Sequence, residues 1–316
     1  MTTISAFAPD GVPEVRESDN LAALLLPLVE LADGDIVVVT SKVVSKAEGR
    51  VVDGGRDELL PGETSRVVAR RGPTTIVRNR LGLTMAAAGI DESNVEKGRS
   101  VLLPADPDGS ARALRRALAD ITGRNVGVIV TDTAGRAWRE GQTDIAIGAA
   151  GLTVLEDYAG RLDAHGNELA VTAPAVADEI AGLAELVAGK LTGRPFVVVR
   201  GRADLVLPAG DPGPGAGSLI RAEGGDLFGY GSREAVIRAV TGRADDRRPF
   251  GTPAPADELA VAITGATGLP ATVVAPDLVT CGGHRLDAIE TLAFAHGWEV
   301  ETGQSPGDLR MRPVTT

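Results

Sequence analysis

Cysteine, histidine and aromatic residues are scarce in this sequence of 316 residues, and basic residues are outnumbered by acidic ones. The single cysteine, Cys281, excludes an internal disulfide and is typical of a reducing compartment. The three histidines lack a metal-ligand spacing, which argues against a zinc site. With 32 Lys and Arg against 43 Asp and Glu, the net charge of −11 disfavours nucleic acid as the main partner. An anionic substrate would therefore need a metal ion or a few well-placed cations.

Long hydrophobic runs are also missing. No stretch approaches the roughly 18 apolar residues that a membrane span requires. The first ten residues have neither the basic start nor the apolar core of a signal peptide. We therefore expect a cytoplasmic protein that has no membrane partner. Its length suits one large domain or two ordinary ones, with an aliphatic core rich in alanine.

The most informative stretch runs from residue 126 to residue 151. It opens with an apolar, β-branched run, Val126–Val130, typical of a strand buried on both faces. The run is followed by Thr131, Asp132, Thr133, Arg136 and Arg139. A carboxylate beside hydroxyls at the end of a buried strand suits a hard cation such as magnesium or manganese. The same residues also fit a turn capped by Asp132 with solvated arginines, and this stretch alone does not decide between the two interpretations.

Two further segments carry polar residues suited to binding an anion. A second buried strand, 36–40, leads into the segment 41–50, which supplies hydroxyls and cations of the kind that bind phosphate. Taken alone, that composition favours a solvated, lysine-rich helix. Asp91 and Asn94 offer a carboxylate and an amide on a loop, although an isolated Asp-x-x-Asn is more often part of a turn.

Helical and strand patterns alternate along most of the chain. Helices are predicted over 21–31, interrupted by Pro27, and over 175–190, and a further buried strand over 196–200. After a linker rich in proline and charge, the tail shows a helix, strand, helix, strand pattern. We predict an α+β fold with mixed sheets and helices in two subdomains, followed by a small α/β C-terminal appendage.

Several of these segments, in the same order along the chain, resemble the coenzyme F420:γ-glutamyl ligase family, including the N-terminal half of its two-domain actinobacterial members. The matching stretches fall within residues 1–245: Gly11-Val-Pro13, 39–50, 88–95, 103–111, Val130-Thr-Asp-Thr-Ala-Gly-Arg136 and Val199-Arg-Gly201.

The resemblance implies a GTP-dependent ligase that adds L-glutamate through an amide bond to the deazaflavin precursor of coenzyme F420. The γ-phosphate of GTP would activate a substrate carboxylate as an acyl phosphate, which the glutamate amine then attacks. Magnesium or manganese would be required, with potassium assisting. The family also implies an intertwined homodimer. Residues 1–245 would form the ligase domain, and residues 246–316 a short extension that is too small for a nitroreductase domain, so we predict no flavin.

Site residues carried over from the family fall into two groups. The expected metal ligands are Asp91, Asp132 and Thr133. The expected GTP contacts are Val12, Pro13, Glu14, Val15, Ser41, Lys46 and Asn94. No catalytic residue is assigned. Some archaeal relatives have a further metal-binding glutamate where this chain has Gly189-Lys190-Leu191, so that ligand is missing here.

Two alternatives remain open. One is a deazaflavin-binding carrier without catalysis, and the other is the same ligase chemistry on a different carboxylate substrate. The sequence does not fix how many glutamates are added, whether the oxidised or the dehydro precursor is preferred, or what the C-terminal extension does.

Overall fold

A computed structural model describes residues 3–222, 224–226, 228–302 and 308–314. Contacts between Cα atoms divide the chain into two compact units. The first contains the residues up to Val67 and those from Gly72 to Ile220, and the second contains Val68–Arg71 and the residues from Arg221 onward. Because compactness does not define a functional domain, the ligase domain over 1–245 stays a prediction.

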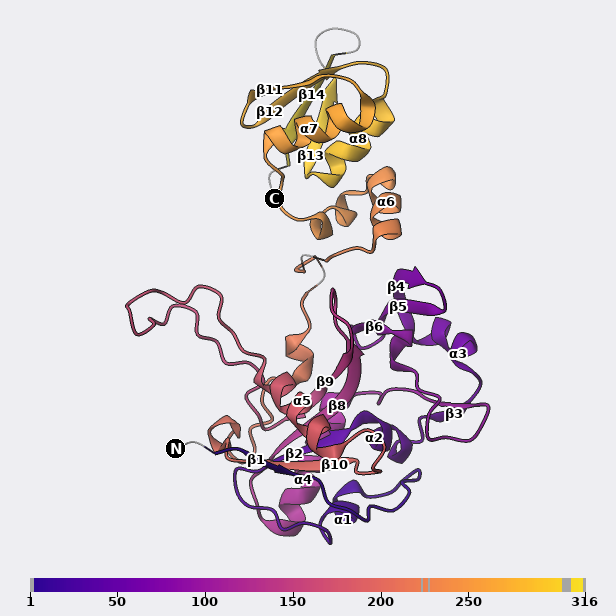
Figure 1. Cartoon of the computed structure of the whole chain (residues 1–316), viewed down its shortest axis with the longest axis vertical. Helices are drawn as coiled ribbons and strands as arrows, with labels where there is room; N and C mark the ends of the chain where they lie inside the picture. Colours follow the sequence, from indigo (N-terminus) through magenta and orange to yellow (C-terminus); the bar gives the residue numbers. More distant parts are fainter. Residues whose placement is uncertain (1–2, 223, 227, 303–307, 315–316) are drawn as a thin grey trace. The chain divides into compact units, whose positions relative to one another are not determined.

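The first unit is built around a five-stranded sheet in the order β1-β10-β2-β8-β9 (Figure 1). These strands are β1 (Ser5–Phe7), β10 (Phe196–Arg200), β2 (Ile36–Thr40), β8 (Gly127–Gly135) and β9 (Gln142–Ala150). β2 and β8 run parallel, and the other neighbouring pairs run antiparallel. The sheet is therefore mixed, in agreement with the predicted α+β class.

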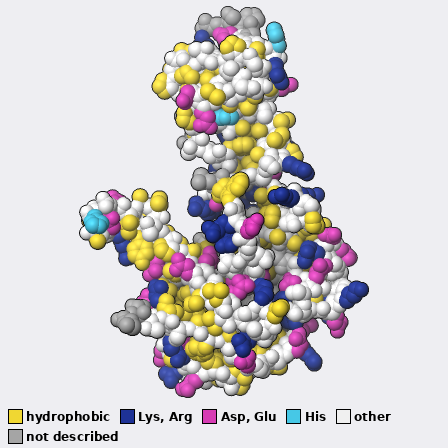
Figure 2. Space-filling view, in the orientation of Figure 1, with side chains coloured by type: hydrophobic (Ala, Val, Ile, Leu, Met, Phe, Trp, Pro, Cys, Tyr) yellow, Lys and Arg dark blue, Asp and Glu magenta, His cyan; other side chains and the backbone are white. Residues whose placement is uncertain are grey.

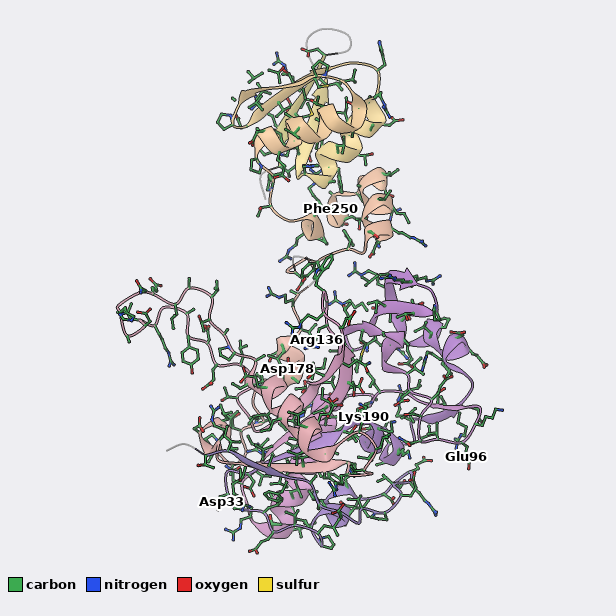
Figure 3. All side chains as sticks on the ribbon, viewed as in Figure 1. Asp33, Glu96, Arg136, Asp178, Lys190 and Phe250 are labelled. Atoms are coloured by element: carbon green, nitrogen blue, oxygen red, sulfur yellow. The ribbon has the colours of Figure 1, made fainter. Side chains whose placement is uncertain are left out.

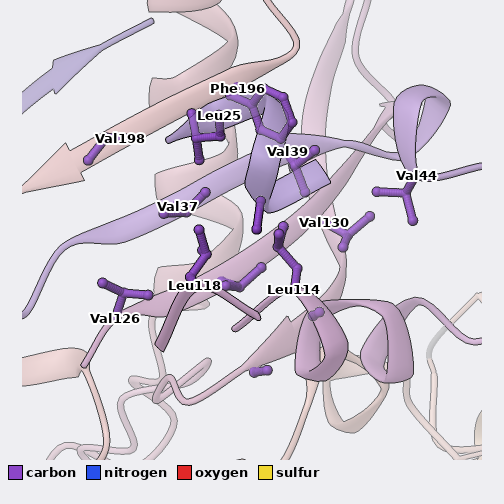
Figure 4. Close-up of a cluster of buried hydrophobic side chains, with 14 of the residues drawn as sticks. Leu25, Val37, Val39, Val44, Leu114, Leu118, Val126, Val130, Phe196 and Val198 are labelled. Carbon is purple, nitrogen blue, oxygen red and sulfur yellow. The ribbon is translucent and has the colours of Figure 1, made fainter. Parts of the chain in front are cut away.

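Both faces of this sheet are buried. Val37 and Val39 of β2 pack with α1 (Leu21–Leu25) and α4 (Pro107–Thr122) in a first core cluster (Figure 4). The alternate residues Ile36 and Val38 pack with α5 (Val176–Ala188) in a second cluster on the opposite face. This double burial explains why β2 and the start of β8 are continuous apolar runs rather than alternating ones.

The remaining elements lie outside this sheet, and one of them, β4, begins in the first unit and ends in the second. α2 (Ser41–Ala47) follows β2 directly. The others are β3 (Val51–Asp53), α3 (Arg56–Glu63), β4 (Thr64–Arg71), β5 (Thr74–Asn79), β6 (Thr84–Ala86), η1 (Ala87–Gly89), β7 (Arg99–Val101), η2 (Ala203–Leu205) and η3 (Ala216–Leu219). β3 pairs with β7, and β4, β5 and β6 form a three-stranded sheet. On the face shown in Figure 2, acidic and basic side chains are interspersed over the first unit.

The second unit has its own core. Its elements are α6 (Ser232–Thr241), η4 (Ala244–Asp246), η5 (Arg248–Phe250), α7 (Ala256–Thr267), β11 (Ala271–Ala275), β12 (Leu278–Gly282), α8 (Leu286–Ala295), β13 (Trp298–Thr302) and β14 (Asp308–Pro313). The strands form an antiparallel sheet in the order β11-β12-β14-β13. Ile263, Ile289, Trp298 and Met311 are fully buried between this sheet and the helices. This unit contains helices and strands, and two of the four strands in its sheet lie where the sequence predicts strands.

One local prediction needs correction. β8 does not end at Val130 but continues to Gly135, because β9 supplies a hydrogen-bonding partner along its whole length after a bulge at Val130/Thr131. Arg136 and Arg139 therefore lie in the hairpin connection between β8 and β9. By contrast, α1 ends at Leu25, before Pro27, as the proline predicts. Within the described ranges, no helix is long and apolar enough to cross a membrane.

Candidate functional site

A cavity of about 650 Å³ in the first unit contains all the residues that were assigned to the site from the sequence. Its wall is formed by the 12–15 segment, the end of β2 with α2, the loop before β7, the β8–β9 hairpin and the loop after α5. Asp91, Asp132 and Thr133 line it together with Val12, Pro13, Glu14, Val15, Ser41, Lys46 and Asn94. The fold therefore brings together segments that are up to about 180 residues apart in the chain, while the role of each residue stays a prediction.

The parallel pairing of β2 and β8 creates the centre of this cavity. Thr40 lies opposite Thr131, so Ser41, where β2 gives way to α2, lies beside Asp132, which continues in β8. The hydroxyl of Ser41 donates to Oδ1 of Asp132 at 3.0 Å. Ser41 is also the first residue of α2, which turns inward here and is not solvated: Ser41, Ser45 and Lys46 are all buried.

Asp144 of β9 also lines the cavity, although the sequence analysis does not single it out. It lies opposite Thr133 in the hairpin. The hydroxyls of Thr131 and Thr133 donate to its two carboxylate oxygens at 2.9 and 2.7 Å. In the sequence, polar residues occur at alternate positions on both sides of a turn, as in the two strands of a β-hairpin. This pattern points to Asp144 only after the hairpin has been located.

Alternation along β8 separates Asp132 from Thr133. The even-numbered Val128 and Val130 belong to the first core cluster, so Asp132 continues that face, where it meets Ser41. Ile129 and the β9 residue Ala146 belong to the second cluster, so Thr131, Thr133 and Asp144 continue the face on which α5 packs. Asp132 and Thr133 thus approach the cavity from opposite faces of the hairpin.

The carboxyl groups in the cavity differ in how easily they ionise. Burial raises the pKa of Asp132 to about 7, against the hydrogen bond from Ser41, and the charges of Asp144 and Asp91 add to the increase. Burial also raises the pKa of Asp144, although both threonine hydroxyls and the charge of Lys190 work against it. Burial disfavours ionisation of Asp91 too, but hydrogen bonds from Lys42 and Ser93 outweigh it and lower the pKa.

Three lysine ammonium groups occupy the cavity wall. Lys42 Nζ lies 2.6 Å from Asp91 Oδ2. Lys46 Nζ is paired with Glu14, which joins α2 to the 12–15 segment. Lys190 Nζ donates to Thr133 Oγ1 at 2.6 Å. The cavity therefore combines fixed positive charge with acidic side chains, as an anion-binding site in an acidic protein requires.

The donors in this cavity fit a hard divalent cation. They are carboxylate and hydroxyl oxygens, which Mg²⁺ and Mn²⁺ prefer. A cation at Asp132 would offset the repulsion from Asp91 and Asp144 that raises its pKa. Among the residues that the structure describes, no three His, Cys, Asp or Glu side chains are close enough to hold one metal ion, so phosphate or water oxygens would have to complete its coordination.

The raised pKa of Asp132 predicts an unusual pH dependence of stability in metal-free protein. The folded state holds the Asp132 proton up to about pH 7, whereas the unfolded chain releases it near pH 4. Because the folded state binds more protons in this interval, the contribution of Asp132 to the free energy of unfolding falls as pH rises from about 4 to about 7. Urea unfolding in EDTA at a series of pH values should show a fall in stability, and the fall should be smaller in D132N, which keeps only the contributions of other carboxyl groups with raised pKa such as Asp144. An identical pH profile in the two proteins would contradict the assignment.

Comparisons with known proteins agree with the resemblance in the sequence. The family model described as F420-0:Gamma-glutamyl ligase matches residues 11–57 and 56–201, which include the ten predicted site residues and Asp144. The coenzyme F420:L-glutamate ligase of Archaeoglobus fulgidus is 42% identical over 220 residues, covering 63% of this chain and 88% of that protein. Its namesake from Methanothermobacter thermautotrophicus is 38% identical over 224 residues, covering 63% and 89%. The protein of the same name from Methanopyrus kandleri is 39% identical over 238 residues, covering 68% and 93%.

Proposed function

Because the chain belongs to the F420-0:γ-glutamyl ligase family, we propose that it uses GTP to join L-glutamate to a deazaflavin precursor of coenzyme F420. The observation that carries the proposal is the convergence of the ten expected metal and GTP residues on one cavity. The relatives' names support glutamate ligation. The residues around the cavity support the binding of a nucleotide and a metal ion that would take part in this reaction.

The proposed reaction has two steps. The acceptor carboxylate attacks the γ-phosphorus of GTP, the bond to the β,γ-bridging oxygen breaks, and GDP leaves. The amine of glutamate, having lost a proton, then attacks the acyl carbon, and phosphate departs as the amide forms. Divalent metal, when bound, would offset charge on the β- and γ-phosphates.

The chain's own residues would bind and orient the reactants. Asp132 and Asp91 would hold the metal, with Ser41 fixing the Asp132 carboxylate. Lys46 would place a positive charge near the phosphates from the buried side of α2. Asn94 would supply an amide for orientation. Potassium, a homodimer and a cytoplasmic location remain part of the proposal.

The test is a reconstituted ligation assay. The protein is incubated with GTP, Mn²⁺, L-glutamate and the glutamate-free precursor, and the products are followed by mass spectrometry and phosphate release. We expect GDP, phosphate and the precursor increased by glutamyl residues, with little product when ATP replaces GTP. Precursor binding without nucleotide hydrolysis would instead assign a non-catalytic carrier. GTP hydrolysis that depends on a different carboxylic acid would assign the same chemistry to another substrate.

A further inference from the structure

Lys190 lies in the loop that follows α5 (Figure 3), and its ammonium group contacts two oxygen atoms. Its Nζ lies 2.6 Å from Thr133 Oγ1 and 3.2 Å from Glu185 Oε1. Thr133 uses its only hydroxyl proton to bond Asp144, so a lone pair of its oxygen faces the ammonium. One hydroxyl and two carboxylates thus contribute to this corner, which is the donor set of a cation site.

The loop conformation fixes Lys190 at this point. α5 ends at Ala188 and is capped by Gly189, which has a φ of +72°, and the loop turns again at Gly193 with the same φ. Between them, the hydroxyl of Thr192 donates to the carbonyl oxygen of Gly189 at 3.0 Å. Although the Lys190 side chain is 64% exposed, it lines the cavity and its ammonium has two partners. The partial negative charge at the end of α5 favours the same position.

This corner is distinct from the place where Asp132 would bind a metal. Thr133, Asp144 and Glu185 approach from the face of the hairpin on which α5 packs, whereas Asp132 approaches from the face of the first core cluster. Oxygen donors therefore face the cavity from both faces of the hairpin. On the α5 face the Lys190 ammonium contacts Thr133 and Glu185. On the other face, the Asp132 carboxylate accepts a hydrogen bond from the neutral hydroxyl of Ser41.

We infer that the Lys190 ammonium is the resident cation on the α5 face of the hairpin, so that this chain binds one divalent ion, at Asp132, and not two. The inference rests on the proposed function, because it takes the cavity to be a metal–nucleotide site. Lys190 acts as a positioning residue: it neutralises Asp144 and Glu185 and holds Thr133 without a second metal. The ammonium charge of +1 takes the place of the +2 charge of a divalent ion, so this corner of the cavity attracts a further anion less strongly.

The test counts bound Mn²⁺ by electron paramagnetic resonance, with isothermal titration calorimetry for affinity, in the full-length protein with GDP. We expect the wild-type chain to bind one Mn²⁺. K190R keeps the positive charge and should also bind one. K190Q removes the ammonium from Glu185 and from the neighbourhood of Asp144 and should gain a second, weaker ion. K190E adds a ligand and should bind that second ion at least tenfold more tightly than K190Q does. Lys97 is an exposed lysine outside the cavity, and K97Q should behave like the wild type.

The outcomes separate the inference from the function on which it rests. Two Mn²⁺ ions bound to the wild-type chain, or a single ion bound to both K190Q and K190E, would overturn the role of Lys190 and leave the ligase proposal intact. Absence of bound Mn²⁺ in every protein, including K190R, would overturn the metal assignment itself. Circular dichroism of each variant establishes that it is folded before the ions are counted.

Discussion

Replacing Asp132 by asparagine is expected to reduce ligase turnover by a factor of about 10³ or more while the protein stays folded. The size follows from the several kcal/mol by which a bound metal stabilises charge in the transition state of phosphoryl transfer. Asparagine keeps the shape of the side chain and can still accept the hydrogen bond from Ser41. It removes the negative charge that would hold the cation. Turnover is measured as GDP release in the ligation assay, and Mn²⁺ binding by calorimetry.

The same substitution is expected to stabilise the metal-free protein at pH 8. At that pH the wild-type Asp132 carries a charge that its surroundings disfavour, since burial raises its pKa to about 7. Removing the charge relieves this cost, so D132N in EDTA should melt at a higher temperature than the wild type. Adding Mn²⁺ should raise the melting temperature of the wild type much more than that of D132N. A gain in stability coupled to a loss of activity is typical of a functional site.

Asp178 offers a matched control for Asp132. It is also half-buried, and burial raises its pKa, but it accepts a hydrogen bond from the backbone amide of Ala146 and does not line the cavity. D178N should therefore keep Mn²⁺ binding and turnover within a few-fold of wild type. Near-normal turnover in D132N, or an equal loss in D178N, would contradict the metal-binding role of Asp132.

The sequence predicts the buried strands well and the polar edge of the sheet less well. β2 and β10 are found at the predicted residues because both of their faces are buried, which leaves an uninterrupted apolar run. β8 continues past Val130 because hydrogen bonds to β9 replace apolar burial as the reason for extended structure. These hydrogen bonds come from a separate segment of the chain. The local sequence, with its polar residues Thr131–Thr133, therefore indicates that the strand ends at Val130.

In the second unit, β14 has the alternation of a half-buried strand, with Leu309 and Met311 buried and Arg312 exposed. It was missed because its arginines and terminal proline are typical of a polar loop, although the period of two was visible. The alternation of apolar and polar residues therefore indicates a strand here, whereas the amino-acid composition alone favours a loop.

The candidate site, too, is only partly predictable from the sequence. From the residues alone, only the stretch around Asp132 and the lysines of 41–50 pointed to anion or metal chemistry, and the latter favoured a solvated helix. The buried position of Lys46 depends on α2 packing into the cavity wall, which no local pattern reveals. Asp91, Asn94 and the 12–15 segment were placed by family resemblance. Asp144 required the register of the hairpin.

Lys46 is expected to be the second residue with a large effect. K46M should weaken binding of GTP about 10- to 100-fold, because a charge-assisted hydrogen bond to phosphate contributes about 1.5–3 kcal/mol. Methionine keeps most of the length and the apolar stem of the lysine, so the packing of this buried position is preserved. Affinity is measured by calorimetry with GTP and Mg²⁺, and K97M, at an exposed position outside the cavity, serves as the control.

Lys46 has an alternative role, which the Glu14 partner can test. The ion pair between Lys46 and Glu14 holds the 12–15 segment against α2, and that segment is itself an expected GTP contact. E14Q removes the ion pair but leaves the ammonium in place. If Lys46 binds phosphate directly, E14Q should lose much less GTP affinity than K46M, because the freed ammonium no longer shares its charge with a carboxylate. Equal losses in the two variants would show that Lys46 only anchors the segment, and the phosphate would then depend on the metal at Asp132 and on the other cavity cations.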